Sequence, residues 1–134
     1  IIEAKLSSYI TSILTELFLC SRKKETEALT HQSLSETISY INEHFAEPLT
    51  LEDLAERAAL SPFYFSRKFS QATGMTPHQY ILATRINAAR FLLKTSALSV
   101  KEIAFHCGFT SESSFCTTFR KWEHISPGAY RDAE

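Results

Sequence analysis

The chain contains few of the residues that make tight turns or covalent cross-links. Its 134 residues include 3 Gly and 4 Pro. These are too few for a β-sandwich or barrel, which needs many tight turns, and for a glycine-rich phosphate loop in addition to ordinary turns. The 3 Cys are an odd number without a C-x-x-C pair, so they predict neither a disulfide framework nor a zinc module. We therefore expect a helical protein with free thiols and no cofactor.

Long apolar runs are also missing. The longest apolar stretch, residues 10–20, is short and contains Glu16, and no cleavable signal sequence opens the chain. These features predict a cytoplasmic protein with no membrane partner. Because the first residue is Ile rather than Met, we expect a fragment or a trimmed product. No arrangement of nucleophile, base and carboxylate stands out, so we expect no enzyme activity.

Charge is strongly segregated along the chain, although the formal net charge is only -1. Residues 36–56 contain six acidic residues and no Lys or Arg, whereas residues 57–101 contain seven basic residues and no Asp or Glu. Segregation of this kind gives a nearly neutral protein one positive face, as binding to a polyanion requires. The simpler alternative is that each charge run is only a solvated surface.

Hydrophobic periodicity divides the first part of the chain into two helices and a linker. Residues 1–22 carry apolar side chains in steps of three and four, which predicts an amphipathic helix. Residues 23–33 are polar without a clear period and are interpreted as a linker. A second helix follows from residue 34, and Pro48 should end it near residues 44–47.

The sequence beyond Pro48 repeats itself. Residues 51–60 align with residues 100–109 at an offset of 49, and residues 65–80 align with residues 115–130 at an offset of 50. Each copy is predicted to be two helices joined by a short turn, at about residues 50–72 and 99–122. Thr50 and Ser99 are expected N-caps, the latter in an S-x-x-E capping box with Glu102. A long helix from Thr76-Pro77 to about residue 95 joins the copies.

This pattern predicts an all-α fold of two helix-turn-helix subdomains joined by a long linker helix and preceded by an N-terminal amphipathic helix. If the spaced Phe residues of each second helix face the core, the opposite stripe faces outward. The side chains on these two stripes are the expected contacts to DNA bases: Phe63, Ser66, Arg67, Ser113, Cys116 and Thr117. Basic side chains nearby are the expected contacts to phosphates: Lys68, Arg85, Arg90, Lys94, Arg120 and Lys121.

Each of these residues has a simpler alternative. Arg67 can form two hydrogen bonds to one guanine, and Phe63 can pack on a thymine methyl group. Arg67 could instead contact phosphate or form a surface ion pair. Phe63 could instead be a partly buried core residue. Cys116 on the outward stripe could be a redox switch or a small space-filling residue. At the level of the whole chain, the alternative to a DNA-binding protein is a helical-repeat scaffold for a protein partner.

The doubled unit resembles the DNA-binding domain of the AraC/XylS family of bacterial transcription regulators. The resemblance covers residues 34–134 and rests on Gly108-Phe109, on Ser126-Pro127-x-x-Tyr130-Arg131, and on Arg85-Ile86-x-x-Ala89-x-x-Leu92-Leu93 in the linker helix. Two positions depart from the family pattern. His124 stands where Gly is usual before the final Ser-Pro, and Thr117 stands where some members have Arg.

The resemblance implies several expectations about function. The two units would occupy successive major grooves on one face of double-stranded DNA and activate transcription through contact with RNA polymerase. An N-terminal sensing and dimerisation domain commonly precedes such units and binds the effector small molecule. Residues 1–22 would then be the last helix of that domain. Its apolar face could pair with the same helix of a second chain, or it could pack against the DNA-binding domain across the linker.

Overall fold

The structure, a computed structural model, describes residues 27–133. Within this range the chain is helical and contains no β-strand, which confirms the all-α prediction. The predicted amphipathic helix over residues 1–22 lies outside the described residues. The described helices span residues 27–44, Leu51–Arg57 (α2), Pro62–Thr73 (α3), Pro77–Thr95 (α4), Val100–His106 (α5), Glu112–Glu123 (α6) and Pro127–Asp132 (α7). None of them is both long and apolar enough to cross a membrane.

The helix over residues 27–44 begins earlier than the sequence pattern predicts. Residues 27–33 were expected to be linker, yet they are helical and continuous with the residues that follow. This segment contains neither Gly nor Pro, and Gln32 donates a hydrogen bond to Glu36 one turn later at 3.2 Å. Its polarity hid the helix, because most of these side chains face solvent. The helix ends at residue 44, as Pro48 predicts.

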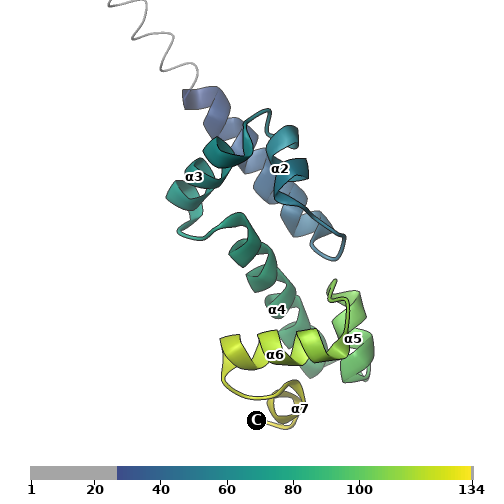
Figure 1. Ribbon diagram of the computed structural model, residues 1–134. Helices are drawn as coiled ribbons and strands as arrows, with labels where there is room; N and C mark the ends of the chain where they lie inside the picture. The colour runs from purple at the N-terminus through teal and green to yellow at the C-terminus, as the bar shows by residue number, and fades with distance from the viewer. Residues whose placement is uncertain (1–26, 134) are drawn as a thin grey trace, which may run out of the picture.

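The helices form two units, each with its own hydrophobic core, and α4 takes part in both (Figure 1). The first unit comprises the 27–44 helix, α2, α3 and the start of α4. The second comprises the rest of α4 with α5, α6 and α7. Along α4, Ile81 is buried in the first core, whereas Ile86, Ala89 and Leu93 are buried in the second. One continuous helix therefore connects the two cores and spaces them apart.

Three aromatic residues in each unit repeat the same geometry. In the first unit the ring of Phe69 lies 5.6 Å from Phe65 and 5.5 Å from Tyr80, between ring centres. In the second unit Phe119 lies 5.7 Å from Phe115 and 5.4 Å from Tyr130. The last contact in each trio is edge-to-face, an arrangement that contributes about 0.5–1.5 kcal/mol beyond burial of area. The internal repeat found in the sequence is therefore a repeat of packing.

Hydroxyl side chains define where the helices begin. Thr50 accepts a hydrogen bond from the Asp53 amide at 3.1 Å, and Ser99 accepts one from the Glu102 amide at 3.1 Å. Both N-caps were predicted, but the capping box predicted at Ser99 is incomplete, because the Glu102 side chain does not accept a hydrogen bond from the Ser99 amide. The complete reciprocal capping box forms at Thr76, where the side chain of Gln79 also accepts from the Thr76 amide. Each such cap stabilises its helix by about 1 kcal/mol.

Among residues 27–133, four turn residues adopt the left-handed backbone conformation, and the two units use glycine at different places. In the first helix-turn-helix, Ala59 has φ 58°, whereas its counterpart Gly108 in the second has φ 91°. At the ends of α3 and α6 the roles reverse, because Gly74 ends α3 with φ 76° and His124 ends α6 with φ 66°. A side chain with a Cβ is strained in this conformation. His124 therefore costs the second unit stability.

Replacement of His124 by glycine tests this strain. His124→Gly should raise the free energy of unfolding by up to about 1 kcal/mol, because relief of left-handed strain outweighs the added freedom of the unfolded chain. Lys121→Gly is the matched control, since it lies in the helical part of α6 and should lose about 1 kcal/mol. Urea unfolding followed by circular dichroism measures both. Equal destabilisation by the two changes would contradict the strain at His124.

Candidate nucleic-acid interface

The outward stripe of α3 is exposed at Phe63 and Arg67 and half-buried at Ser66. Ser61 caps the helix by accepting from the Tyr64 amide, and Pro62 occupies the first turn, so α3 begins directly after the turn that follows α2. Phe65 and Phe69 are completely buried. Phe63 is 79% exposed, so it is not a core residue. Its ring is therefore available to contact another molecule.

Arg67 and Ser66 share this stripe with Phe63. Arg67 is exposed and forms no hydrogen bond or ion pair with any described residue, whereas Ser66 is half-buried. The guanidinium of Arg67 therefore keeps all its donors for a ligand, as a bidentate contact to guanine requires. The alternative of an intramolecular surface ion pair finds no support among residues 27–133.

The corresponding stripe of α6 is polar and smaller. Ser113 and Thr117 are exposed, Cys116 is half-buried, and Ser111 caps the helix by accepting from the Ser114 amide at 3.0 Å. Phe115 and Phe119 are completely buried beneath this stripe. The two recognition helices thus present outward positions in the same order, with Thr117 at the position of Arg67.

The two described cysteines are weak candidates for redox chemistry. Burial raises the pKa of Cys107 to about 11, and a weaker opposite effect comes from the nearby Arg85. The pKa of Cys116 is also raised, by burial first and by the carboxylate of Glu112 second. Because the thiolate is the reactive form, both thiols are held in their less reactive state at neutral pH. Cys116 therefore fits a space-filling residue better than a redox switch.

The basic residues expected at phosphates fall into two groups. Arg120 and Lys121 are exposed on α6, and Lys68 lies 5.4 Å from the ring centre of Tyr64 on α3. The other members of the set are held by partners within the protein. Arg90 pairs with Glu123 at 2.9 Å and contacts Asn87, and Lys94 donates to the Ala133 carbonyl and lies 4.9 Å from the Tyr130 ring centre.

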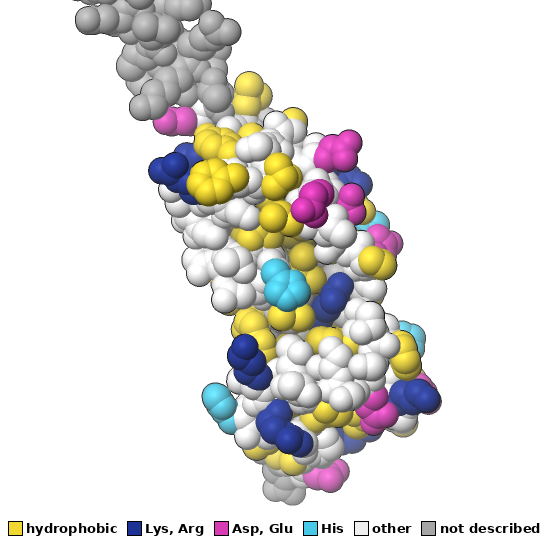
Figure 2. Space-filling view, viewed as in Figure 1, with side chains coloured by type: hydrophobic (Ala, Val, Ile, Leu, Met, Phe, Trp, Pro, Cys, Tyr) yellow, Lys and Arg dark blue, Asp and Glu magenta, His cyan; other side chains and the backbone are white. Residues whose placement is uncertain are grey.

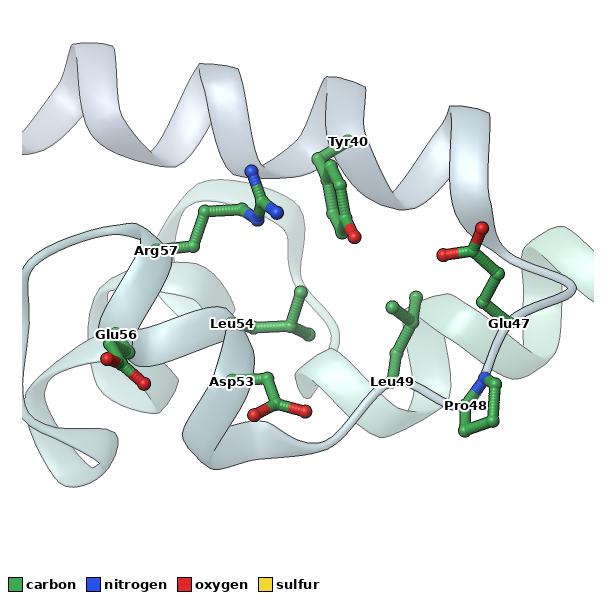
Figure 3. A pocket seen from close by; sticks show the side chains of 8 residues that line it. All are labelled: Tyr40, Glu47, Pro48, Leu49, Asp53, Leu54, Glu56 and Arg57. Atoms are coloured by element: carbon green, nitrogen blue, oxygen red, sulfur yellow. The ribbon is translucent and has the colours of Figure 1, made fainter.

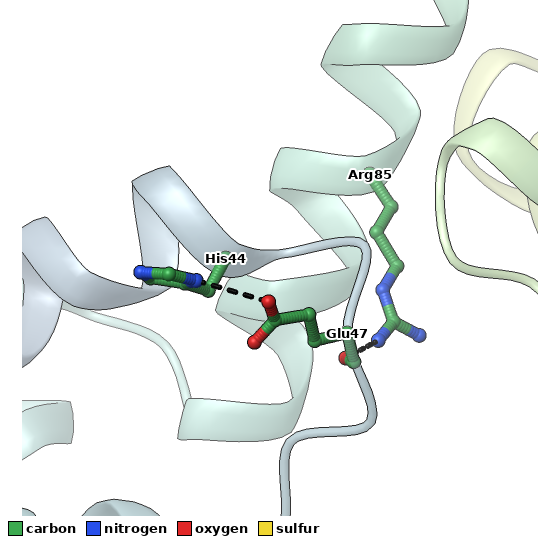
Figure 4. A network of polar contacts seen from close by, with 3 residues as sticks. All are labelled: His44, Glu47 and Arg85. Atoms are coloured by element: carbon green, nitrogen blue, oxygen red, sulfur yellow. Dashed lines mark hydrogen bonds and ion pairs between the residues drawn. The ribbon is translucent and has the colours of Figure 1, made fainter.

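Arg85 differs from the expectation of a phosphate contact. Its Nε donates to the carbonyl of Phe45 at 2.7 Å and its Nη2 to the carbonyl of Glu47 at 3.0 Å, and Figure 4 shows the second of these. Burial lowers the pKa of this guanidinium. The side chain thus stabilises the loop that connects the 27–44 helix to α2. Two of its five N–H donors are used inside the protein, so Arg85 has a structural role and is not assigned to the proposed DNA interface.

Arg131 plays the same part in the second unit, and sequence analysis missed that role. It donates to the carbonyl of Leu93 at 3.1 Å and to that of Leu98 at 2.6 Å, in the loop between α4 and α5. In each unit an arginine from the following helix therefore holds the loop that precedes the helix-turn-helix. The only signal in the sequence was the presence of Arg131 in the motif that carries the family resemblance.

The segregated charges occupy different parts of the first unit. A pocket of about 440 Å³ lies beside α2 and has carboxylates of Glu47, Asp53 and Glu56 among its lining residues (Figure 3). The guanidinium of Arg57 stacks there on the ring of Tyr40 at 3.6 Å from its centre. Figure 2 shows acidic side chains gathered on one side of this unit. These carboxylates would repel phosphate, so the pocket does not belong to a DNA-binding face.

The structure also bears on metal binding. Among residues 27–133, no group of three or more His, Cys, Asp or Glu side chains is placed to hold a metal ion.

Comparison with known proteins agrees with this geometry. The protein-family model described as "Helix-turn-helix domain" matches residues 54–133. The chain is 38% identical over 119 residues to the "HTH-type transcriptional activator RhaS" of Escherichia fergusonii, covering 87% of this chain and 43% of that protein. It is 41% identical over 101 residues to the "Uncharacterized HTH-type transcriptional regulator YijO" of Escherichia coli strain K12, covering 75% of this chain and 36% of that protein. The chain thus spans less than half the length of these relatives.

Solved structures show the same arrangement. The DNA-binding domain of AdpA, described as a global transcriptional factor and crystallised with a target DNA, has a TM-score of 0.71 and 40% identity. The match covers 73% of this chain and 88% of that one. The C-terminal domain of AraT, a response regulator from Geobacillus stearothermophilus, has a TM-score of 0.71 and 34% identity, covering 74% of this chain and 83% of that one.

Proposed function

The chain belongs to the AraC/XylS family of bacterial transcription regulators, and from this membership we propose that α3 and α6 enter successive major grooves on one face of double-stranded DNA. Sequence-specific DNA binding and regulation of transcription are the functions of this family. One observation carries the proposal for this chain. Two equivalent helices each bury two Phe and turn equivalent side chains outward.

The first unit supplies most of the base recognition in this proposal. Arg67 contacts guanine through its free guanidinium, Phe63 presses on a thymine methyl group, and Ser66 serves either type of base. In the second unit Ser113, Cys116 and Thr117 occupy the equivalent places but offer no long cationic side chain. The second unit therefore reads fewer bases than the first.

Phosphate contacts position the two units without specifying a sequence. Lys68, Arg120 and Lys121 fit this role best, because none of them forms a salt bridge with a described residue. Arg90 and Lys94 can reach phosphate only if they exchange their present contacts with Glu123 and the Ala133 carbonyl. They therefore take a secondary place in the proposed interface.

The scaffold alternative explains these features less well. A protein-binding helical repeat needs no free arginine on the outward stripe and no separation of acidic from basic residues along the chain. Both features are present here, and a domain that is 40% identical to this chain was crystallised with its target DNA. These observations support DNA over a protein ligand.

Activation of transcription, contact with RNA polymerase and control by an effector small molecule extend this proposal. The name of the RhaS relative describes an activator, which supports activation rather than repression. An effector would act through a separate N-terminal domain. We expect these activities in the cytoplasm, where a bacterial regulator meets the nucleoid.

Arg67→Ala tests base recognition. It should weaken binding to the preferred site by about 1–3 kcal/mol and relax base preference at one or two positions, because a bidentate guanine contact is lost. Thr117→Ala is the matched control at the equivalent position of α6 and should have a smaller effect. Binding to a randomised duplex library, with sequencing of the bound pool, measures both affinity and preference.

Two outcomes would contradict these assignments. Equal weakening on all sequences after Arg67→Ala would make Arg67 a phosphate contact. A larger effect from Thr117→Ala than from Arg67→Ala would reverse the ranking of the two units.

A homodimer through residues 1–22 is the last part of the proposal. If this segment forms the helix that its sequence predicts, its apolar face from Ile2 to Leu17 is wide for a helix surrounded by water and needs a partner. Two paired chains would then join two DNA sites and bind them more tightly than either alone.

Removal of residues 1–22 tests that dimer. Sedimentation of the intact chain at micromolar concentration should show a dimer, and the shortened chain should be a monomer that still recognises one site more weakly. A monomer in both cases would eliminate self-association through this segment.

A further inference from the structure

The two units meet at a second place besides α4. The loop over residues 45–47, which connects the 27–44 helix to α2, belongs to the first unit. Its Phe45 and Glu47 carbonyls accept hydrogen bonds from Arg85 on α4 at 2.7 and 3.0 Å. These carbonyls follow the end of a helix, where the backbone carries partial negative charge and acceptors lack helical partners. A guanidinium with two parallel donors fits this site well.

The same loop lies against the turn of the second helix-turn-helix. A Cβ built on Gly108 would come within 2.8 Å of the Ala46 Cα and 2.9 Å of its carbonyl oxygen. These atoms are backbone and cannot rotate away, so only glycine permits the approach. The guanidinium of Arg85 also lies 6.0 Å from the ring centre of Phe109, the residue after Gly108. We call this contact of loop 45–47 with Arg85, Gly108 and Phe109 the junction.

The junction matters because the two hydrophobic cores are separate. One buried cluster contains residues from the 27–44 helix, α2, α3 and Ile81, and the other contains residues from Ile86 onward. If α4 were the only link, bending or twisting of that one helix would change the direction of α6 relative to α3. A second point of attachment removes this freedom.

We propose that Arg85 and Gly108 are positioning residues that fix the orientation of α6 relative to α3. They thereby set the spacing that the protein accepts between its two half-sites, the DNA segments bound by α3 and by α6. This inference rests on the proposed function, since it assumes that both helices bind one duplex. Binding two half-sites together gains affinity only when the geometry of the linked units matches their spacing. A rigid junction therefore gives high affinity at one spacing and a steep loss at others.

The first experiment measures orientation without DNA. Residual dipolar couplings of the ¹⁵N-labelled full chain report whether the two units share one alignment. The wild type should fit a single alignment, whereas Gly108→Ala and Arg85→Ala should each require a separate alignment for each unit. Gly74→Ala is the matched control, because Gly74 has a similar left-handed φ of 76° but no atom within 4 Å of a built Cβ.

The control separates contact from strain. Gly74→Ala should keep the single alignment although it suffers a similar left-handed backbone strain to Gly108→Ala. Unchanged relative orientation in both Gly108→Ala and Arg85→Ala would overturn the inference. Arg85→Lys guards against misfolding of the alanine variant and should shift the orientation less, because one ammonium group cannot replace the planar fork.

The second experiment measures spacing on a duplex selected by the wild-type chain from a random pool. Insertion of one base pair between the half-sites should weaken wild-type binding by about tenfold or more, because it turns one half-site away from its helix. Gly108→Ala and Arg85→Ala should lose only about threefold on the same insertion, since their units can adjust. Each variant should bind an isolated half-site as the wild type does.

The outcomes distinguish failure of the junction's role from failure of the proposed function. Equal loss on insertion for wild type and variants would overturn the role of the junction while leaving the proposed function intact. A wild type that selects no two-part site would overturn the proposed function and the spacing role together. The dipolar couplings would still decide whether the junction orients the units.

Discussion

The structure depends on α4, a single helix of 19 residues that is built into two hydrophobic cores. Its first turns bury Ile81 in one core and its later turns bury Ile86, Ala89 and Leu93 in the other. At about 1.5 Å per residue the helix spans about 28 Å, slightly less than the 34–36 Å or so of one DNA turn. Every other element is placed relative to this helix, including the two recognition helices.

In the proposed complex, electrostatics selects the face that meets DNA. The outward stripe of α3 carries a free Arg67, while the carboxylates of the first unit gather beside α2 around Arg57 and Tyr40. A duplex approaching the wrong side would meet Glu47, Asp53 and Glu56. The near-zero net charge of the chain therefore conceals a surface with a definite polarity, which steers a polyanion to one side.

Local sequence signals predicted much of this architecture. These signals act on residues only a few positions away in the sequence: hydroxyl residues before each helix, the repeated Phe spacing and Pro48. The caps, the two buried stripes and the end of the 27–44 helix could therefore be predicted. The candidate outward stripe followed from the buried one. The internal repeat also predicted that both units would pack alike.

Features set by distant contacts could not be predicted in this way. Arg85 has the sequence signature of a phosphate contact, yet its partners lie 38 and 40 residues earlier in the chain. Arg131 is similar, with carbonyl partners 33 and 38 residues earlier. The helical residues 27–33 were mistaken for linker because their side chains are mostly solvated. In each case the missing information was which groups the fold brings together.

The central claim is that α3 and α6 occupy successive major grooves on one face of the same duplex. Hydroxyl-radical footprinting on a selected site tests it most directly, because each protected region marks where the protein covers the backbone. The account predicts two protected regions on one face, about 10 base pairs apart from centre to centre. A single region, or two regions on opposite faces of the duplex, would contradict it.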